Sequence, residues 1–231
     1  MSLTKNYWSK SMLEKLYSYR FELFLFSQIV ILFGSLIFRG DFFEIIISPL
    51  LFLINLAAGV LLISKKKKLT WFFIVLLMVS GVVFGADLLE IQNDRFFAFL
   101  NMGTYFLFYT IVTFEIIQQI WETKIVNKNV IFGLISGYIA LGLISFFVCL
   151  SIELANPGSF QGLNANMDES QSFTERIMYY SYITLMTIGY GEIVPVTSLA
   201  QKAAILIGML GQFYLVILTA IVVGKYINQK K

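Results

Sequence analysis

The sequence predicts an all-α membrane protein with six transmembrane helices and one shorter helix that enters the bilayer and returns. Three observations support this fold class: an apolar composition, long apolar blocks, and one apolar stretch too short to cross a bilayer. Of the 231 residues, 58% are hydrophobic and 13% are charged, about half the charged fraction typical of soluble domains. The blocks are continuous rather than alternating, which favours helices over a β-barrel.

Six segments are long and apolar enough to cross a bilayer core of about 30 Å. They are Phe21–Phe38, Phe42–Ile63, Leu69–Leu89, Phe96–Ile120, Val130–Ile152 and Leu199–Ile227. Before them, residues 1–20 place Trp8, Met12, Leu16 and Tyr19 at helical spacing, opposite several charged residues. This spacing predicts an N-terminal helix in the cytoplasmic membrane interface. A basic tail without regular structure is the alternative.

The basic residues are distributed unequally between the two sides of these spans. Of the 17 lysines and arginines, 13 fall on the side of the N-terminus, including the run Lys65–Lys68. The other side receives only Arg39, Arg95, Arg176 and Lys202. By the positive-inside rule, we expect a multi-pass protein of the cell membrane with both termini cytoplasmic. The lysine run is interpreted as a topology determinant, with a lipid-binding patch as the alternative.

Two residue types that many enzymes and metal sites depend on are scarce. The chain has no histidine, and Cys149 is its one cysteine. Histidine-ligated metals, Ser–His–Asp catalysis and an intrachain disulfide are therefore excluded. No other cluster of residues offers a convincing enzyme site. We expect no enzymatic activity, no cofactor and no nucleic-acid partner.

The connection between the fifth and sixth segments does not have the composition of a simple loop. Ser151–Ser172 is polar, and Phe173–Met186 is apolar again but too short to cross the bilayer. Thr174 and Glu175 predict a helix start at this point. We therefore expect a half-length helix, followed by backbone that is buried in protein or lines a watery cavity.

The residues that follow this half-helix are Thr187-Ile188-Gly189-Tyr190-Gly191-Glu192. They resemble the threonine–aliphatic–Gly-Tyr-Gly selectivity filter of the potassium channel superfamily, with Glu192 where aspartate is usual. The resemblance covers about Val130–Tyr226. It implies the architecture of voltage-gated channels, with six spans, a pore helix and a filter in each subunit. One filter strand supplies a quarter of each oxygen ring, so it also implies a homotetramer.

The filter chemistry accounts for the residue types in this motif. K⁺ must lose its hydration shell, and closely spaced carbonyl oxygens can replace the lost water. The resemblance assigns K⁺ binding to the backbone carbonyls of Thr187, Ile188, Gly189 and Tyr190. Gly189 and Gly191 accept the left-handed backbone conformation that such a strand needs. Thr187 can also add its hydroxyl group.

The resemblance assigns supporting roles to residues around the filter. Tyr190 is expected to point away from the pore axis and pack against Tyr179 and Tyr180, which would hold the ring of filter strands open. Glu192 is expected at the outer mouth, where a carboxylate raises the local cation concentration.

Gly211 lies twenty residues after Gly191, and its spacing from Pro195 matches the hinge glycine of the family's pore-lining helix. We expect Gly211 to act as a gating hinge, with close helix packing as the alternative reading. Ile217–Val223 would then form an apolar inner constriction that closes by losing water.

Three regions follow from this reading of the chain. Residues 21–121 would form a four-helix domain of the voltage-sensor type, 122–129 a cytoplasmic linker, and 130–231 the pore domain. Residues 96–121 contain no lysine or arginine, whereas a voltage sensor needs basic residues that move through the membrane field. We therefore predict weak or absent voltage dependence. Three carboxylates remain within the spans: Glu22 near the inner end, and Glu44 and Glu115, neither of which has an obvious basic partner.

The function expected from these features is passive, potassium-selective conduction across the membrane. One rival is a non-selective cation channel, because Met186 stands where the family commonly has threonine. Another is the membrane subunit of a potassium-uptake transporter, although the chain shows no inverted repeat. A weaker possibility is an accessory protein that assembles with a separate channel.

Overall fold

The computed structural model describes residues 16–37, 42–88, 95–163 and 172–229. These residues are almost entirely helical. The elements are α2 (Arg20–Phe33), η1 (Gly34–Leu36), η2 (Phe43–Ile47), α3 (Ser48–Ile63), α4 (Lys67–Leu88), α5 (Arg95–Glu122), α6 (Lys128–Ala155), β1 (Phe160–Gln161), α7 (Phe173–Leu185), β2 (Val194–Pro195), α8 (Ser198–Phe213), η3 (Tyr214–Leu218) and α9 (Thr219–Asn228). The expected interfacial helix over residues 1–20 lies mostly outside the described residues.

Five helices in the described residues are long and apolar enough to cross a membrane. They are Ile45–Ile63, Lys67–Ala86, Phe99–Glu122, Lys128–Ala155 and Ser198–Asn228. The first expected span, Phe21–Phe38, corresponds to α2 and η1, which together end at Leu36 and fall short of that length. The described residues thus match five of the six expected spans.

Side chains at the helix starts explain several of the boundaries. Asn127 begins α6, because its side chain accepts hydrogen bonds from two backbone amides of the first turn. Ser172 begins α7 in a capping box with Glu175, in which each side chain accepts a hydrogen bond from the other's backbone amide. The predicted start at Thr174 is therefore two residues late, because Ser172 is the residue whose side chain accepts the free amide of Glu175.

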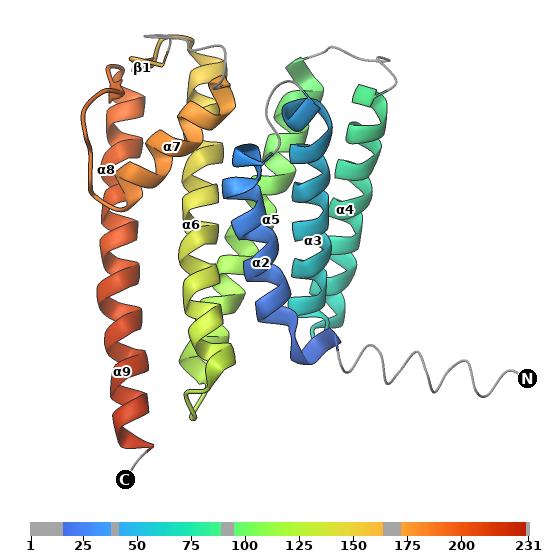
Figure 1. Cartoon of the computed structure of the whole chain (residues 1–231), viewed down its shortest axis with the longest axis vertical. Coiled ribbons are helices and arrows are strands. Elements are labelled where there is room, and N and C mark those ends of the chain that lie inside the picture. The colour runs from blue at the N-terminus through green and yellow to red at the C-terminus, as the bar shows by residue number, and fades with distance from the viewer. Residues whose placement is uncertain (1–15, 38–41, 89–94, 164–171, 230–231) are drawn as a thin grey trace, which may run out of the picture.

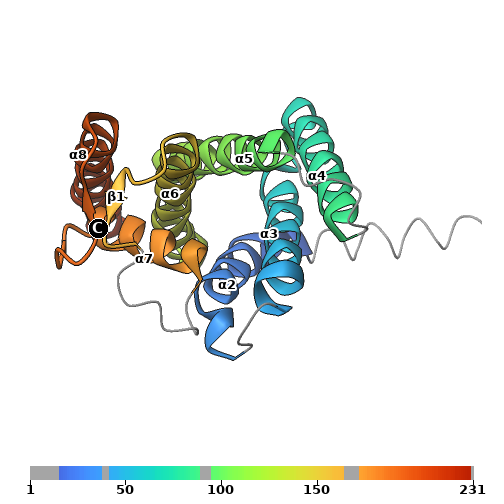
Figure 2. The same ribbon diagram turned by 90° about the horizontal axis from the view of Figure 1, so that it is seen from above.

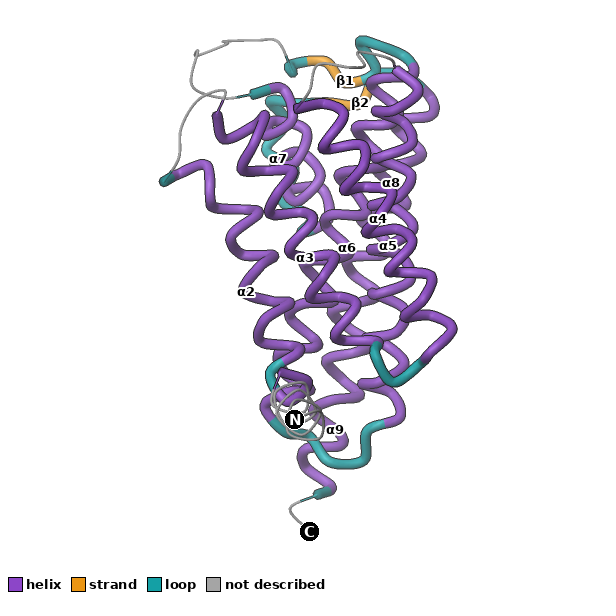
Figure 3. Tube along the Cα trace, turned by 90° about the vertical axis from the view of Figure 1, so that its right-hand side faces the viewer, coloured by secondary structure: helices purple, strands orange, loops and turns teal. Residues whose placement is uncertain are grey.

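The helices lie along the long axis of the molecule, as Figure 1 shows. We call the end with the β1–β2 pair the hairpin end and the opposite end, where the last helix finishes, the α9 end. Seen from above, α6 stands between α8 and the group α2–α5, and α7 runs across beside α6 from the side of α8 (Figure 2). The view from the side shows that α7 occupies only the half of the molecule near the hairpin end (Figure 3).

A buried polar network fixes α2, α3 and α5 relative to one another. The amide of Asn55 donates to the hydroxyl of Ser27 at 2.8 Å and accepts a hydrogen bond from the Tyr109 hydroxyl at 2.8 Å. Aromatic rings surround it, and Tyr109 stacks on Phe147 of α6 with ring centroids 6.1 Å apart. Because a buried polar group without a partner is costly, such a network selects one arrangement of the helices.

Candidate functional site

The half-helix α7 is held against α6 by a tyrosine. With 13 residues, α7 is about 20 Å long, which is well short of a bilayer core. The hydroxyl of Tyr182 donates to the backbone carbonyl of Ile139 at 2.8 Å. Its ring occupies the space beside Gly142, where any side chain would overlap it. The chain therefore enters from the hairpin end and must return to that end after α7, as the sequence predicts.

The loop after α7 has an alternating backbone. The φ angle is 57° at Thr187, 55° at Gly189 and 92° at Gly191, whereas Ile188 and Tyr190 are not among the residues with positive φ. Alternation between right- and left-handed conformations turns successive carbonyl groups towards the same side, unlike a regular β-strand. A row of carbonyl oxygens on one side is a ligand set for a dehydrated cation.

Thr187 is the unexpected member of this alternation. The sequence indicates left-handed backbone at the two glycines, but a threonine in this conformation costs about 1–2 kcal/mol. Three contacts hold it there. The amide of Thr187 donates to the carbonyl of Thr184 at 3.0 Å, and the amide of Ile188 donates to the carbonyl of Ile183 at 2.9 Å. The hydroxyl of Thr187 accepts a hydrogen bond from the side chain of Gln212 at 3.0 Å.

The loop is anchored again at the hairpin end, by contacts that the sequence analysis did not anticipate. Strand β2 follows the loop and pairs antiparallel with β1, with Phe160 opposite Pro195 and Gln161 opposite Val194. Gly162, with a φ of 96°, lies against the carbonyl of Glu192, and a side chain there would overlap that oxygen. The two ends of the loop are therefore fixed by different elements.

Two charged side chains hold β1 in place. Both carboxylate oxygens of Glu153 accept backbone amides, from Gly158 at 2.6 Å and Phe160 at 3.1 Å. The guanidinium of Arg176 donates to the carbonyl of Gly162 at 2.7 Å. The sequence signal for this arrangement is weak, namely a glutamate at a helix end shortly before an Asn-Pro-Gly turn.

The expected tyrosine support has a different geometry in the single chain. Tyr190 is 72% exposed, and none of the ring contacts in the described residues joins it to Tyr179 or Tyr180. Tyr180 is buried against Phe160 of β1, with ring centroids 5.0 Å apart. Tyr180 therefore supports the hairpin end of this subunit, and a contact of Tyr190 with either tyrosine stays a prediction.

Tyr179 lies beside the residue expected at the outer mouth. The nearby carboxylate of Glu192 is the largest of the influences that raise the pKa of Tyr179 to about 12, ahead of burial and Tyr190. Tyr179 therefore stays protonated at neutral pH, and Glu192 lies close to α7.

Gly211 lies where the last helix packs closely against the end of α7. It is buried on α8, and a Cβ at this position would overlap the carbonyl oxygen of Leu185, the last residue of α7. The helix does not end at Gly211. It continues to Phe213 and then becomes π-helical over Tyr214–Leu218. The hinge role is untested, whereas the packing role has direct geometric support.

The last helix is bound to α6 in the same way as α7. The hydroxyl of Tyr214 donates to the carbonyl of Leu134 at 2.8 Å, and a Cβ on Gly137 would overlap that hydroxyl. The rest of the helix leaves large apolar side chains uncovered in the single chain. They include Leu206, Met209, Phe213, Ile217 and Val223, all about half exposed. Within the predicted constriction Ile217–Val223, Ile217 and Val223 belong to this uncovered surface, whereas Leu218 and Val222 are buried.

At the α9 end, the last helix is bound to the turn between α5 and α6. The ammonium of Lys225 donates to the carbonyls of Ile120 at 3.0 Å and Thr123 at 2.8 Å, so it caps the C-terminus of α5. The side chain of Gln229 accepts from the amide of Val126 at 2.7 Å and donates to its carbonyl at 3.2 Å. Nothing local in the sequence indicates these contacts, which join residues about a hundred positions apart.

Two of the three carboxylates noted in the spans have basic partners, which corrects the expectation that Glu115 lacks one. Glu115 lies 2.7 Å from the ammonium of Lys66, which belongs to the lysine run. Glu22 lies 2.9 Å from Lys128. The side chain of Glu44 is outside the described residues.

Comparison with known proteins supports the interpretation of residues 133–228 as the pore region of a channel. A family model described as "Ion channel" matches residues 133–228, which include α7, the alternating loop and the last helix. The comparisons with curated proteins and with solved structures found no match. Residues 133–228 are thus similar to an ion channel family, and the five apolar helices indicate a protein that crosses a membrane several times.

Proposed function

We propose that this protein is a potassium-selective channel in which four identical subunits surround one pore and conduct K⁺ passively. The observation that carries the proposal is the alternating backbone of Thr187–Gly191 after a half-length helix. Such a strand presents its carbonyl oxygens on one side, and four strands around an axis make rings of oxygens. These rings replace the hydration shell of K⁺.

The uncovered surfaces of the single chain support the tetramer. Tyr190 is 72% exposed, and apolar residues of α8, η3 and α9 are half exposed. Exposed apolar side chains of a membrane helix face either lipid or a partner subunit, and the exposed Tyr190 and Gln212 beside this surface favour a partner subunit. Gln212, the polar side chain bonded to Thr187, is exposed next to the apolar stretch Ala203–Gly211 of the same helix. It fits the wall of a water-filled cavity better than a lipid-facing surface.

The charges support the orientation and the mode of gating. Lys66, Lys128 and Lys225 are at or near the α9 end, so we place this end in the cytoplasm. The fourth helix, α5, has no basic residue between 96 and 121. A helix without gating charges gains little energy from a change in membrane potential, so conduction should depend only weakly on voltage.

The test is ion flux into liposomes that contain purified protein, under K⁺ or Na⁺ gradients. The wild-type protein should pass K⁺ in preference to Na⁺ and should be blocked by barium. Tyr190→Ala should lose this preference, whereas Ile188→Val, a matched control that keeps the aliphatic residue of the motif, should retain it. Unchanged selectivity in Tyr190→Ala would break the assignment of the filter.

A non-selective cation channel is the second candidate. It is favoured by Met186, which is 41% exposed and directly precedes Thr187. Its thioether cannot supply the hydroxyl that the family commonly has at this position. A reversal potential that does not shift when K⁺ is exchanged for Na⁺ would support this candidate. Uptake that requires a second ion would instead indicate a transporter subunit.

A further inference from the structure

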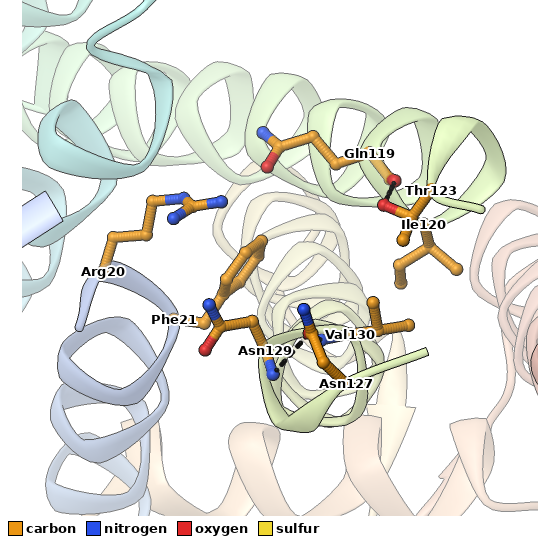
Figure 4. Close-up of a pocket in the computed structure, with 8 residues that line it drawn as sticks. All are labelled: Arg20, Phe21, Gln119, Ile120, Thr123, Asn127, Asn129 and Val130. Carbon is orange, nitrogen blue, oxygen red and sulfur yellow. Dashed lines mark hydrogen bonds between the residues drawn. The ribbon is translucent and has the colours of Figure 1, made fainter. Parts of the chain in front are cut away.

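One polar side chain of the last helix contacts the loop after α7. The amide of Gln212 donates to the hydroxyl of Thr187 at 3.0 Å, and both residues are exposed in the single chain. The bond is separate from the pocket of about 90 Å³ at the α9 end, which Figure 4 shows and which residues of α2, α5 and α6 line. It therefore lies on an open side of the subunit, where other subunits of the proposed channel would stand.

Gln212 is on the opposite side of the last helix from the residues that pack on α6. Tyr214, Leu218 and Val222 are buried, and Tyr214 is bonded to a carbonyl of α6. Gln212 precedes Tyr214 by two residues, which is a rotation of about 200° around a helix. Gln212 therefore points away from α6. Its bond to Thr187 places it where the loop leaves α7, at the inner end of the predicted filter.

The bond constrains a hydroxyl group that is a ligand in the proposed filter. A threonine hydroxyl has one proton and two lone pairs. The amide of Gln212 occupies one lone pair of Thr187, which fixes the orientation of the side chain and leaves the second lone pair for a cation. Without this bond, the side chain can rotate among its staggered conformations. The preceding residue, Met186, offers only a weakly accepting thioether.

We propose that Gln212 is a positioning residue that sets the cation affinity of the inner end of the filter through the hydroxyl of Thr187. The inference rests on the proposed function, because one hydroxyl becomes part of a cation site only where the strands of several subunits meet. The amide oxygen of Gln212 is a second oxygen close to this end of the filter. The experiment separates an action through Thr187 from a direct contact of Gln212 with the ion.

The probe is Ba²⁺, whose binding is measured by thermal unfolding of the protein in detergent with increasing BaCl₂. Gln212→Met keeps the length of the side chain but removes the donor. The half-saturating Ba²⁺ concentration should therefore rise about threefold or more. Gln201→Met is the matched control, because Gln201 also donates from α8, to the carbonyl of Pro195 at 3.3 Å, but near the hairpin end. It should bind Ba²⁺ like the wild type.

A second variant should shift the affinity in the opposite direction. A carboxylate accepts hydrogen bonds and donates none. In Gln212→Glu, Thr187 must donate its own proton, which leaves both lone pairs of its oxygen free beside a negative charge. The half-saturating Ba²⁺ concentration should fall about tenfold or more. Weaker binding in both variants would indicate disturbed packing and would overturn the proposal.

A double-mutant cycle identifies the atom through which Gln212 acts. Thr187→Val removes the hydroxyl and keeps the branched shape of the side chain. In that background, Gln212→Met should change the Ba²⁺ affinity no further, because the two residues act through one bond. An equal effect of Gln212→Met with and without the hydroxyl would overturn the proposal and indicate direct contact with the ion. Unchanged affinity in Gln212→Met would overturn it as well.

Ion flux separates this inference from the proposed function. In liposomes, the half-blocking concentration of cytoplasmic Ba²⁺ should follow the same order among the variants. A protein that binds Ba²⁺ with this dependence on Gln212 but passes no K⁺ would count against the proposed function alone. Selective K⁺ flux with equal Ba²⁺ block in the wild type and Gln212→Met would count against Gln212 alone. No stabilisation of the wild type by Ba²⁺ would overturn both.

Discussion

Replacing Gly211 with alanine places a methyl group against the backbone of α7. The added Cβ would overlap the carbonyl oxygen of Leu185 and lie 3.0 Å from its Cδ1 atom. A backbone carbonyl at a helix end cannot rotate away, so α8 must move. The same change at Gly208, one turn earlier, meets nothing closer than the carbonyl oxygen of Thr184 at 3.8 Å. Gly208→Ala is therefore a matched control on the same helix.

The magnitude follows from the difference between the two variants. Each gains about 1 kcal/mol because alanine is the better helix former. Only Gly211→Ala has the overlap, and overpacking typically costs about 1–3 kcal/mol. We expect its free energy of unfolding to be about 2 kcal/mol below that of Gly208→Ala. For a chain of this length, that corresponds to a Tm about 4–8 °C lower.

The assay is thermal unfolding in detergent micelles, followed by tryptophan fluorescence, with open probability measured on the same preparations. Equal Tm values for the two variants, or a more stable Gly211→Ala, would refute the packing argument. A change in open probability without a lower Tm would instead favour the hinge. Because the overlap alone can alter gating, open probability by itself does not separate the two roles.

Three other substitutions follow from specific contacts. Gln212→Leu removes a neutral hydrogen bond worth about 0.5–1.5 kcal/mol, so the half-blocking concentration of cytoplasmic barium should shift by a few-fold; no shift would mean that the bond contributes nothing to the filter. Lys66→Met should destabilise the protein by roughly 2 kcal/mol more than Glu115→Gln, as measured by thermal unfolding, because it leaves the buried carboxylate (8% exposed) unpaired, whereas Lys66 is 49% exposed and can be solvated. Equal effects of the two variants would argue against a desolvated carboxylate. Gly162→Ala should unfold at a lower temperature than Gly158→Ala. Both glycines have positive φ, but only at Gly162 would the added Cβ overlap a backbone atom, the carbonyl oxygen of Glu192. The reverse order would contradict the close contact between Gly162 and Glu192 at the β1–β2 pair.

The features that could be predicted from the sequence are local ones. The half-helix follows from the length of an apolar stretch, and the loop follows from the resemblance of its motif to a selectivity filter, in which Gly189 and Gly191 permit left-handed backbone at alternate positions. The left-handed conformation of Thr187 could not be predicted, because it depends on hydrogen bonds to α7 and on Gln212, a residue 25 positions away. Threonine itself disfavours that conformation.

The contacts that sequence reasoning missed are the non-local ones. Lys66 and Glu115 are 49 residues apart, and Lys225 binds carbonyls more than a hundred residues before it. Whether a charged side chain finds a partner depends on which helices are neighbours and at what height. Hydrophobic periodicity shows which segments are helices, but it does not contain this information.

Tyr182 and Tyr214 bind α6 in the same way, at two points that lie five residues apart along α6. Each donates to a carbonyl, of Ile139 and of Leu134, and each occupies the space beside the glycine three residues further on. A sliding motion of α8 along α6 would break the Tyr214 bond and force its hydroxyl out of the notch. The part of the last helix that can swing without this loss begins after Tyr214, within the π-helical turn. A pivot at that level would leave the backbone around Thr187 in place, and it would have to break the bonds of Lys225 and Gln229 at the α9 end.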